Sequence, residues 1–187
     1  MAWNPPSYVN HATYDEFKSA TIGQGWDMDG SFGAQCWDGM DLLWYQYGQS
    51  LSTGNTGGAY GCWSVYWARV QNGSGAFSIV GSDINDIKRG DIVVLDTYMG
   101  NGGHIGIADE DYRGDGTLAI YGQNQYPYTS LDGGQFVVTR FSNFSSLFLG
   151  TFRNNEWASP QPQPVWGTHK KRGYPFIIAK HHWNQFR

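Results

Sequence analysis

The chain has 187 residues, of which 17% are aromatic and only 15% are charged, and its formal net charge is -4. This length suits one domain with a real core and a short appendage, but not two full-sized domains. The aromatic content excludes a disordered chain. We expect neither a membrane span nor an export signal. No run of roughly 18 apolar residues occurs, and the first residues lack the cationic and apolar regions of a signal peptide.

The charge is unevenly distributed along the chain. None of the 16 acidic residues follows Glu156, whereas five of the 12 basic residues do. The part of the chain up to Glu156 is therefore acidic. It would be repelled by the phosphate backbone of a nucleic acid, so we expect no nucleic-acid partner. The proline-rich stretch 159–164 is typical of an extended linker. We therefore predict a folded domain over residues 1–156, followed by a linker and a basic, aromatic tail over residues 157–187.

Helical patterns dominate the first part of the chain. Thr13 and Glu16 have the spacing of a capping box, which predicts a short helix that ends before Gly23. A second helix is predicted over residues 36–47, where apolar side chains recur at helical spacing before a glycine. A third, shorter helix is predicted over residues 60–70.

Strand patterns dominate the rest of the chain. Short runs of β-forming residues are separated by clusters of Gly, Asp and Asn, which is typical of an antiparallel sheet. The predicted strands are residues 91–95, 104–108, 117–121, 135–141 and 150–153. Helices followed by strands predict a domain of the α+β class.

Residues 27–38, DMDGSFGAQCWD, have oxygen donors at the spacing of a calcium-binding loop. If Asp27 is the first position, then the third, fifth, seventh and twelfth positions are Asp29, Ser31, Gly33 and Asp38. Hard oxygen donors at these positions of an EF-hand loop bind calcium, so we expect Ca²⁺ here. The match is partial, because the sixth position is Phe rather than Gly and the last is Asp rather than Glu. The alternative is a turn rich in Asp and Gly that leads into a helix with an acidic first turn.

Cys36 lies where this loop meets the second predicted helix. Backbone amides at a helix N-terminus stabilise a thiolate and lower its pKa, so a cysteine here is suited to act as a nucleophile. Two nearby carboxylates, Asp38 and Asp41, oppose this effect, and a bound cation offsets part of their field. The alternative is a small buried apolar residue, an interpretation that fits Cys62 better.

A thiol nucleophile needs an imidazole to take its proton and a third group to orient that imidazole. His104 is the one histidine in the strand-rich part of the chain. Its neighbours on the same face of the strand, Gly106 and Ala108, are small, which predicts an open site. Asn124 follows the next predicted strand, where its amide oxygen could accept a hydrogen bond from the ring. As alternatives, a lone histidine can be structural, and an asparagine at a strand end is an ordinary turn residue.

Together these motifs resemble the cysteine, histidine-dependent amidohydrolase/peptidase (CHAP) domain of bacteriophage lysins, whose papain-like fold is related to that of the NlpC-type peptidases. The resemblance covers about residues 13–156. The segments that carry it are the loop 27–38, Gly90-Asp91-Ile92, Gly103-His104-Ile105-Gly106 and Gly122-Gln123-Asn124. The resemblance implies a papain-like α+β fold in which N-terminal helices pack on an antiparallel sheet.

The resemblance also implies roles for individual residues. Cys36 attacks an amide carbonyl, His104 acts as general base and then as general acid, and Asn124 orients His104. Gln35 and the Cys36 backbone amide are the implied oxyanion donors. The implied calcium ligands are Asp27, Asp29, Ser31, Gly33 and Asp38.

One position departs from the family pattern. Many members have Glu two residues before the Asn, and this chain has Gly122 there. Either Asn124 orients the imidazole alone, or another acid such as Asp109 or Glu110 approaches from elsewhere in the fold.

The implied substrate is bacterial peptidoglycan, and the implied bond is either the sugar-to-peptide amide or a bond within the stem or cross-bridge. Such a phage hydrolase is made in the host cytoplasm without a signal peptide. It acts on the Gram-positive wall after release or as part of the virion. The basic tail holds anionic wall polymers, is the start of a wall-binding module, or is a packed arm. An alternative of a different class is a non-catalytic, calcium-dependent wall-binding module in which Cys36 is structural.

Overall fold

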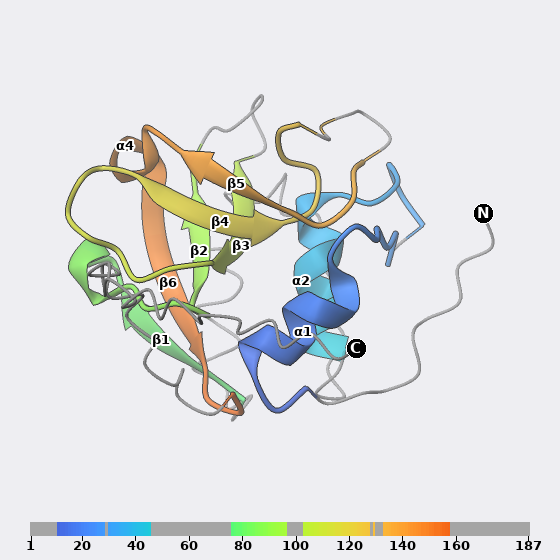
Figure 1. The fold of residues 1–187 in the computed structure, drawn as a ribbon, viewed down its shortest axis with the longest axis horizontal. Coiled ribbons are helices and arrows are strands. Elements are labelled where there is room, and N and C mark those ends of the chain that lie inside the picture. The colour runs from blue at the N-terminus through green and yellow to red at the C-terminus, as the bar shows by residue number, and fades with distance from the viewer. Residues whose placement is uncertain are drawn as a thin grey trace, which may run out of the picture.

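The computed structural model describes residues 11–28, 30–45, 76–96, 103–127, 129 and 133–157. They form a six-stranded antiparallel sheet with two helices on one side of it (Figure 1). The α+β class is therefore confirmed. The predicted helix over residues 60–70 and the chain after Trp157 lie outside the described residues. None of the helices in the described ranges is long and apolar enough to cross a membrane.

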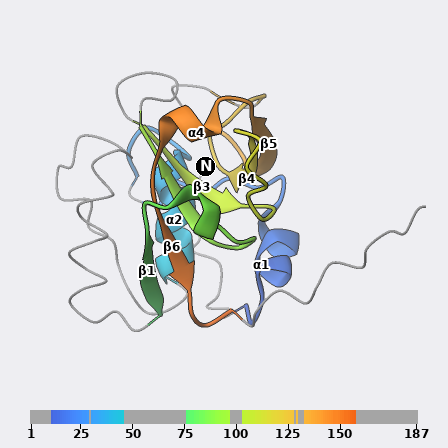
Figure 2. The same ribbon diagram turned by 90° about the vertical axis from the view of Figure 1, so that its left-hand side faces the viewer.

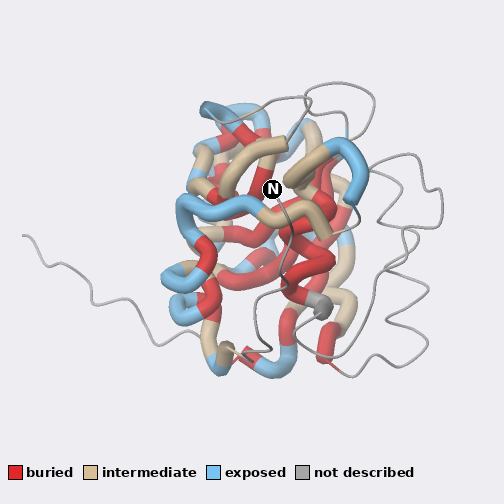
Figure 3. The backbone as a smooth tube through the Cα atoms, turned by 90° about the vertical axis from the view of Figure 1, so that its right-hand side faces the viewer, coloured by how far each residue is buried: buried red, intermediate tan, exposed pale blue. Residues whose placement is uncertain are grey.

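The first two helices form where the sequence predicts them. α1 spans Tyr14–Thr21 and α2 spans Cys36–Tyr45. The Thr13 hydroxyl accepts a hydrogen bond from the Glu16 amide at 3.2 Å, as in a capping box. The Glu16 carboxylate accepts from the Ala12 amide at 2.8 Å rather than from Thr13. Figure 3 shows that α1 has both buried and exposed residues, whereas the described residues of α2 are nearly all buried.

The order of strands in the sheet is β1-β6-β2-β3-β4-β5. The strands are β1 (Phe77–Gly81), β2 (Ile92–Leu95), β3 (His104–Ala108), β4 (Leu118–Gly122), β5 (Val137–Phe141) and β6 (Phe148–Asn154). A 3-10 turn, η2 (Ile84–Asp86), precedes β2, and a short helix, α4 (Phe144–Leu147), leads into β6. Figure 2 shows β1 beside β6 at one edge of the sheet. β2 to β6 match the predicted strands to within a few residues, but β1 and α4 are absent from the sequence prediction.

Two apolar clusters cover the two faces of the sheet. We call them the helix-side cluster and the far-side cluster. The helix-side cluster includes Phe17 of α1, Met40 of α2, and Ile92, Ile105 and Tyr121 of the sheet. The far-side cluster includes Val93, Leu95, Ala108, Ile120 and Phe141. Because side chains alternate along a strand, neighbouring residues such as Val93 and Ile92 belong to different clusters.

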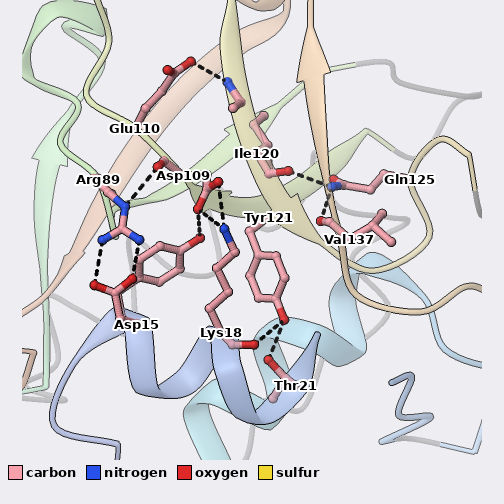
Figure 4. Close-up of polar contacts among 12 residues, drawn as sticks. Asp15, Lys18, Thr21, Arg89, Asp109, Glu110, Ile120, Tyr121, Gln125 and Val137 are labelled. Atoms are coloured by element: carbon pink, nitrogen blue, oxygen red, sulfur yellow. Dashed lines mark hydrogen bonds and ion pairs between the residues drawn. The ribbon is translucent and has the colours of Figure 1, made fainter. Parts of the chain in front are cut away.

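A polar network fastens α1 to the end of β3 (Figure 4). The Asp109 carboxylate accepts hydrogen bonds from Lys18 Nζ at 2.7 Å and from the Tyr14 hydroxyl at 2.6 Å. Arg89 donates through Nε to the Asp109 carbonyl at 3.0 Å and also pairs with Asp15. Burial and the neighbouring Asp109 carboxylate raise the pKa of Tyr14 well above its ordinary value. Tyr14 is therefore a neutral hydrogen-bond donor in this network.

Trp157 is the last residue that the structure describes and the first of the predicted tail. Its ring packs against Tyr14 and Phe17, with centroid distances of 5.7 and 5.8 Å. The side chain is 8% exposed and belongs to the helix-side cluster. This tryptophan therefore extends the core beside α1.

Candidate active site

The loop before α2 is fastened to the segment before β5. Ala34 and Gly133 form an isolated parallel bridge. A Cβ atom at Gly133 would lie 2.3 Å from the Ala34 nitrogen, so only glycine permits this approach. At the tip of the loop, Phe32 has a positive φ of 63° and is 82% exposed. Backbone contacts between two segments that are distant in the sequence therefore fix the position of the loop that leads into α2.

Asp38 caps the N-terminus of α2. One of its carboxylate oxygens accepts the Gln35 amide and the other accepts the Met28 amide, both at 2.8 Å. The side chain is buried, at 1% exposure. An acid in the first turn that reaches back to the residue before the helix is a standard N-terminal cap. This observation gives Asp38 a structural role, as in the alternative to calcium binding.

The rest of the predicted calcium loop is described in part. Asp27 accepts the Ser31 amide at 3.1 Å, and Asp29 lies outside the described residues. Among the described residues, no group of three or more His, Cys, Asp or Glu side chains gathers to hold a metal. A carboxylate oxygen keeps a second lone pair after accepting one hydrogen bond, so Asp27 and Asp38 remain suitable ligands for a cation.

Cys36 is the first residue of α2, and its side chain packs against the helix-side cluster. The backbone amides of Ile105 and Trp37 lie near its sulfur and stabilise the thiolate. Burial raises the pKa of the thiol to about 11, although these amides act in the opposite direction. The expectation of a lowered pKa is therefore wrong for this state, because desolvation of the thiolate outweighs the amides of the helix N-terminus.

His104 is the first residue of β3, and its side chain lies among the far-side residues. It pairs across the sheet with Leu95, and its ring stacks on Phe141 with centroids 5.5 Å apart. The expectation of an open site is wrong, because the side chain is only 1% exposed. Ile120 fills the space beside Gly106, where an added Cβ would lie 2.5 Å from its Cγ2. Burial lowers the pKa of His104 to about 4, so the imidazole is neutral at neutral pH.

Cys36 and His104 approach β3 from opposite faces. The sulfur lies on the helix side, against the amide of Ile105, and the imidazole lies on the far side with Phe141. The thiol therefore lies near the peptide unit that joins His104 to Ile105. Proton transfer between the two side chains requires the imidazole to turn toward the helix side.

Gln35 and Asn124, two further predicted site residues, contact each other. Asn124 has a positive φ of 51° and donates through Nδ2 to Gln35 Oε1 at 2.6 Å. Gln35 Nε2 in turn donates to the Phe32 carbonyl. The structure thus brings Asn124 beside the residue that precedes Cys36 and fixes the orientation of the Gln35 amide.

Two glutamines that the sequence analysis does not single out as site residues flank Asn124. Gln123 is fully buried and fastens the loop before α2, because its side chain bonds the backbone of Trp26 and Gln35. Gln125 Oε1 lies 3.0 Å from His104 Nε2. The only signal for Gln125 in the sequence is that it is a second amide next to Asn124 at a strand end.

Asp109 and Glu110, the two acids considered in place of a Glu at position 122, bind other groups. They follow the last residue of β3, whereas His104 is the first. Asp109 binds Lys18 and Tyr14, as described above. Glu110 accepts the Ala119 amide at 3.1 Å and pairs with Arg140 at 2.7 Å.

No family model matches the chain. Over 117 residues, or 61% of its length, the chain is 36% identical to a D-alanyl-L-alanine endopeptidase of Streptococcus phage B30. It spans 25% of that relative's length. The crystal structure of the wild-type endolysin LysIME-EF1 is similar, with a TM-score of 0.58 and 25% sequence identity. That similarity covers 80% of this chain and 67% of the endolysin chain.

Proposed function

We propose that this chain is a phage peptidoglycan hydrolase that cleaves an amide bond with Cys36 as the nucleophile. The similarity to a phage endopeptidase and to an endolysin supports the substrate class. The observation that carries the chemistry is the position of Cys36. Cys36 is the first residue of α2, and its thiol lies near the peptide unit that joins His104 to Ile105. Such an enzyme acts on the wall after release from the host cytoplasm or as part of the virion.

In this proposal His104 is the general base. The Cys36 thiol keeps its proton at neutral pH, and the imidazole is neutral, so the base must take the proton as the reaction begins. Sulfur then attacks the carbonyl carbon, and the amine leaves with the proton from the imidazolium. Water hydrolyses the resulting thioester with the same imidazole as base. Gly103, with a positive φ of 67°, precedes His104 and gives the backbone freedom for the ring to turn.

The oxyanion of the tetrahedral intermediate needs hydrogen-bond donors near the sulfur. The backbone amide of Cys36 and the side-chain amide of Gln35 are the proposed donors. Asn124 holds Gln35 at 2.6 Å, so we assign Asn124 to the oxyanion side of the site rather than to the imidazole alone. Loss of one such donor lowers kcat by about 10²- to 10³-fold in enzymes of this type.

The name of the phage relative favours a particular bond. A D-alanyl-L-alanine endopeptidase cuts a peptide bond, so we propose a D-alanyl-L-alanyl bond of the wall peptide as the substrate rather than the sugar-to-peptide amide. Mass analysis of fragments from digested wall of defined cross-bridge distinguishes these bonds. New N-terminal alanine on cross-bridge fragments, with the stem peptides still attached to sugar, supports the endopeptidase; stem peptides released from the sugar with their own N-terminal alanine contradict it.

We also propose that Asp27, Asp29, Ser31, Gly33 and Asp38 bind calcium. The oxygen chemistry of these residues suits this ion, and the acid-rich loop leads directly into the helix that begins with Cys36. When bound, calcium would neutralise the carboxylates and make the loop rigid. No step of the reaction passes through the ion.

Clearing of a Gram-positive wall suspension tests the proposed function. We expect the wild type and a Cys62→Ala control to clear the suspension and release amines, and Cys36→Ala to do neither while still binding wall. Equal wall binding without amine release by all three proteins would instead support a wall-binding module. Clearing by Cys36→Ala at the wild-type rate would exclude Cys36 as the nucleophile.

A further inference from the structure

Phe32 has a backbone conformation that does not suit its side chain. Its φ of 63° lies in the left-handed region that favours glycine. The other described positions of the loop 27–38 with a positive φ are Gly30 and Gly33, at 74° and 69°. Asn124 is the one other described non-glycine residue with a positive φ, and asparagine tolerates this region because its short polar side chain can bond locally. The backbone of the loop is therefore strained at Phe32.

The ring of Phe32 adds nothing to the packing of the fold. The residue is 82% exposed, more than any other large apolar residue in the described ranges. It belongs to neither the helix-side cluster nor the far-side cluster. An EF-hand loop has glycine at this sixth position, where it makes the sharp turn without strain. Neither the turn nor the core accounts for an aromatic side chain here, so the ring is available to a molecule outside the chain.

Phe32 is held close to the candidate nucleophile. Its carbonyl accepts a hydrogen bond from Gln35 Nε2, and Gln35 directly precedes Cys36. The loop that carries Phe32 lies beside the segment that leads into β5 (Figure 1). Four extended residues span at most about 14 Å, and the turn in the loop makes the separation of Phe32 from Cys36 shorter than that. A peptide of a few residues bound at Cys36 is therefore long enough to reach Phe32.

We propose that Phe32 is a substrate-binding residue that contacts the wall peptide beside the bond that Cys36 cleaves. This inference rests on the proposed function and adds a binding residue to it. The part of the wall polymer within about 14 Å of the cleaved bond is peptide. The methyl groups of the alanyl residues on both sides of that bond are apolar, and an exposed aromatic ring attracts such groups through dispersion and release of water.

Steady-state kinetics on a sugar-free synthetic wall peptide with a D-alanyl-L-alanyl bond test this role. All proteins would be assayed in saturating calcium, so that a change in the affinity of the loop for the ion does not affect the comparison. We expect Phe32→Gly and Phe32→Asn to raise KM about tenfold with kcat within about threefold of wild type, because the contact is the same in the bound substrate and the transition state. Phe32→Tyr retains the ring and should keep KM within about twofold.

Thermal stability gives a readout that does not depend on activity. Glycine and asparagine suit a left-handed backbone, so we expect Phe32→Gly and Phe32→Asn to have a Tm at or above that of the wild type. Ile22→Ala is the matched control. Ile22 is an apolar residue that follows α1 and is 50% exposed, so its truncation should leave KM unchanged.

Three results would overturn the proposal. An unchanged KM in Phe32→Gly, with an active wild type, would show that the ring does not contact the substrate. A rise in KM with whole wall but not with the sugar-free peptide would place the contact on the glycan. A Tm more than about 5 °C below wild type in both variants would show that the ring holds the loop in place.

Failure of the proposed function gives a different result. In that case the wild type cleaves no wall peptide. The Kd of Cys36→Ala for the same peptide, compared with the Kd of the double variant Cys36→Ala and Phe32→Gly, then tests the contact without any turnover. We expect weaker binding by the double variant, by about tenfold, and equal binding by the two proteins would overturn the role of Phe32.

Discussion

The sulfur of Cys36 lies close enough to the backbone N–H of Ile105, the residue that directly follows His104, for that amide to stabilise the thiolate. The candidate nucleophile is therefore placed by the main chain of β3 and not by the side chain of its base. Substitution of the imidazole should leave the thiol in position. The position of the thiol and the orientation of the imidazole can thus be tested separately.

The buried imidazole predicts a loss of stability in mild acid. Its pKa is lowered from 6.5 to about 4 by burial, so the unfolded chain binds a proton in a range where the folded protein does not. The free energy of unfolding should fall as the pH drops from 6.5 toward 4, by about 3 kcal/mol from this group. Denaturant melts from pH 7 to pH 4 measure this effect.

His104→Gln is the matched variant for that prediction. It removes the titrating group, so the difference in stability between the two proteins should change across the same pH range. A constant difference between pH 7 and pH 4 would show that His104 is not buried as a neutral ring.

Calcium should raise the thermal stability of the chain if the acidic loop binds it. An ion at about 100 times its Kd adds about 2.7 kcal/mol to the free energy of unfolding, which corresponds to several degrees in Tm. We expect Tm to be higher by this amount in the presence of calcium than in the presence of a chelator. Magnesium should give a smaller shift, and Asp27→Asn should show none. An unchanged Tm in the wild type, together with unchanged activity in excess chelator, would contradict the calcium assignment.

The network around Asp109 should stabilise the fold. Its carboxylate is 16% exposed and binds both Lys18 and Tyr14. We expect Asp109→Ala to lower the free energy of unfolding by about 2 to 4 kcal/mol, because it leaves a half-buried ammonium without its partner. Asp111→Ala is the control. That carboxylate is 58% exposed and its pair with Lys88 is 3.6 Å long, so a change within about 0.5 kcal/mol is expected. Equal effects of the two substitutions would contradict this role of Asp109.

Gly106 should tolerate no side chain. An added Cβ would lie 2.5 Å from Ile120 Cγ2 and 3.0 Å from the Tyr121 carbonyl. We expect Gly106→Ala to cost about 1 to 3 kcal/mol of stability through overpacking. Ile120→Leu removes the clashing methyl, so the double variant should be less destabilised than the sum of the two single changes. Strict additivity would contradict the predicted contact.

Local sequence patterns account for most of the elements that support the site. The Thr13 cap and the apolar spacing after Cys36 place α1 and α2, and the β-rich run from His104 places β3. β1 is an edge strand whose one neighbour is β6, and pairing between segments so distant in the chain leaves no local pattern. α4 has a single turn, which is too short for a helical period.

Alternation along a strand predicts that Ile105 and His104 lie on opposite faces, but not which face the helices cover. In the structure α2 covers the face of Ile105, so the imidazole lies on the other side from Cys36. The contact of Gln125, rather than Asn124, with the ring has a similar origin. Asn124 has a left-handed backbone, which breaks the alternation and directs the next side chain toward the ring.

The most direct test of the account is a search for the covalent intermediate on Cys36. The wild type would be mixed with a purified wall peptide, quenched in acid within the first turnover, digested, and analysed by mass spectrometry. We predict an acyl adduct of the substrate on the peptide that contains Cys36, and none on that peptide in Cys36→Ser quenched in the same way. Two results together would contradict nucleophilic catalysis by this thiol. The wild type would release amines steadily with no adduct at any quench time, and Cys36→Ala would release them as well.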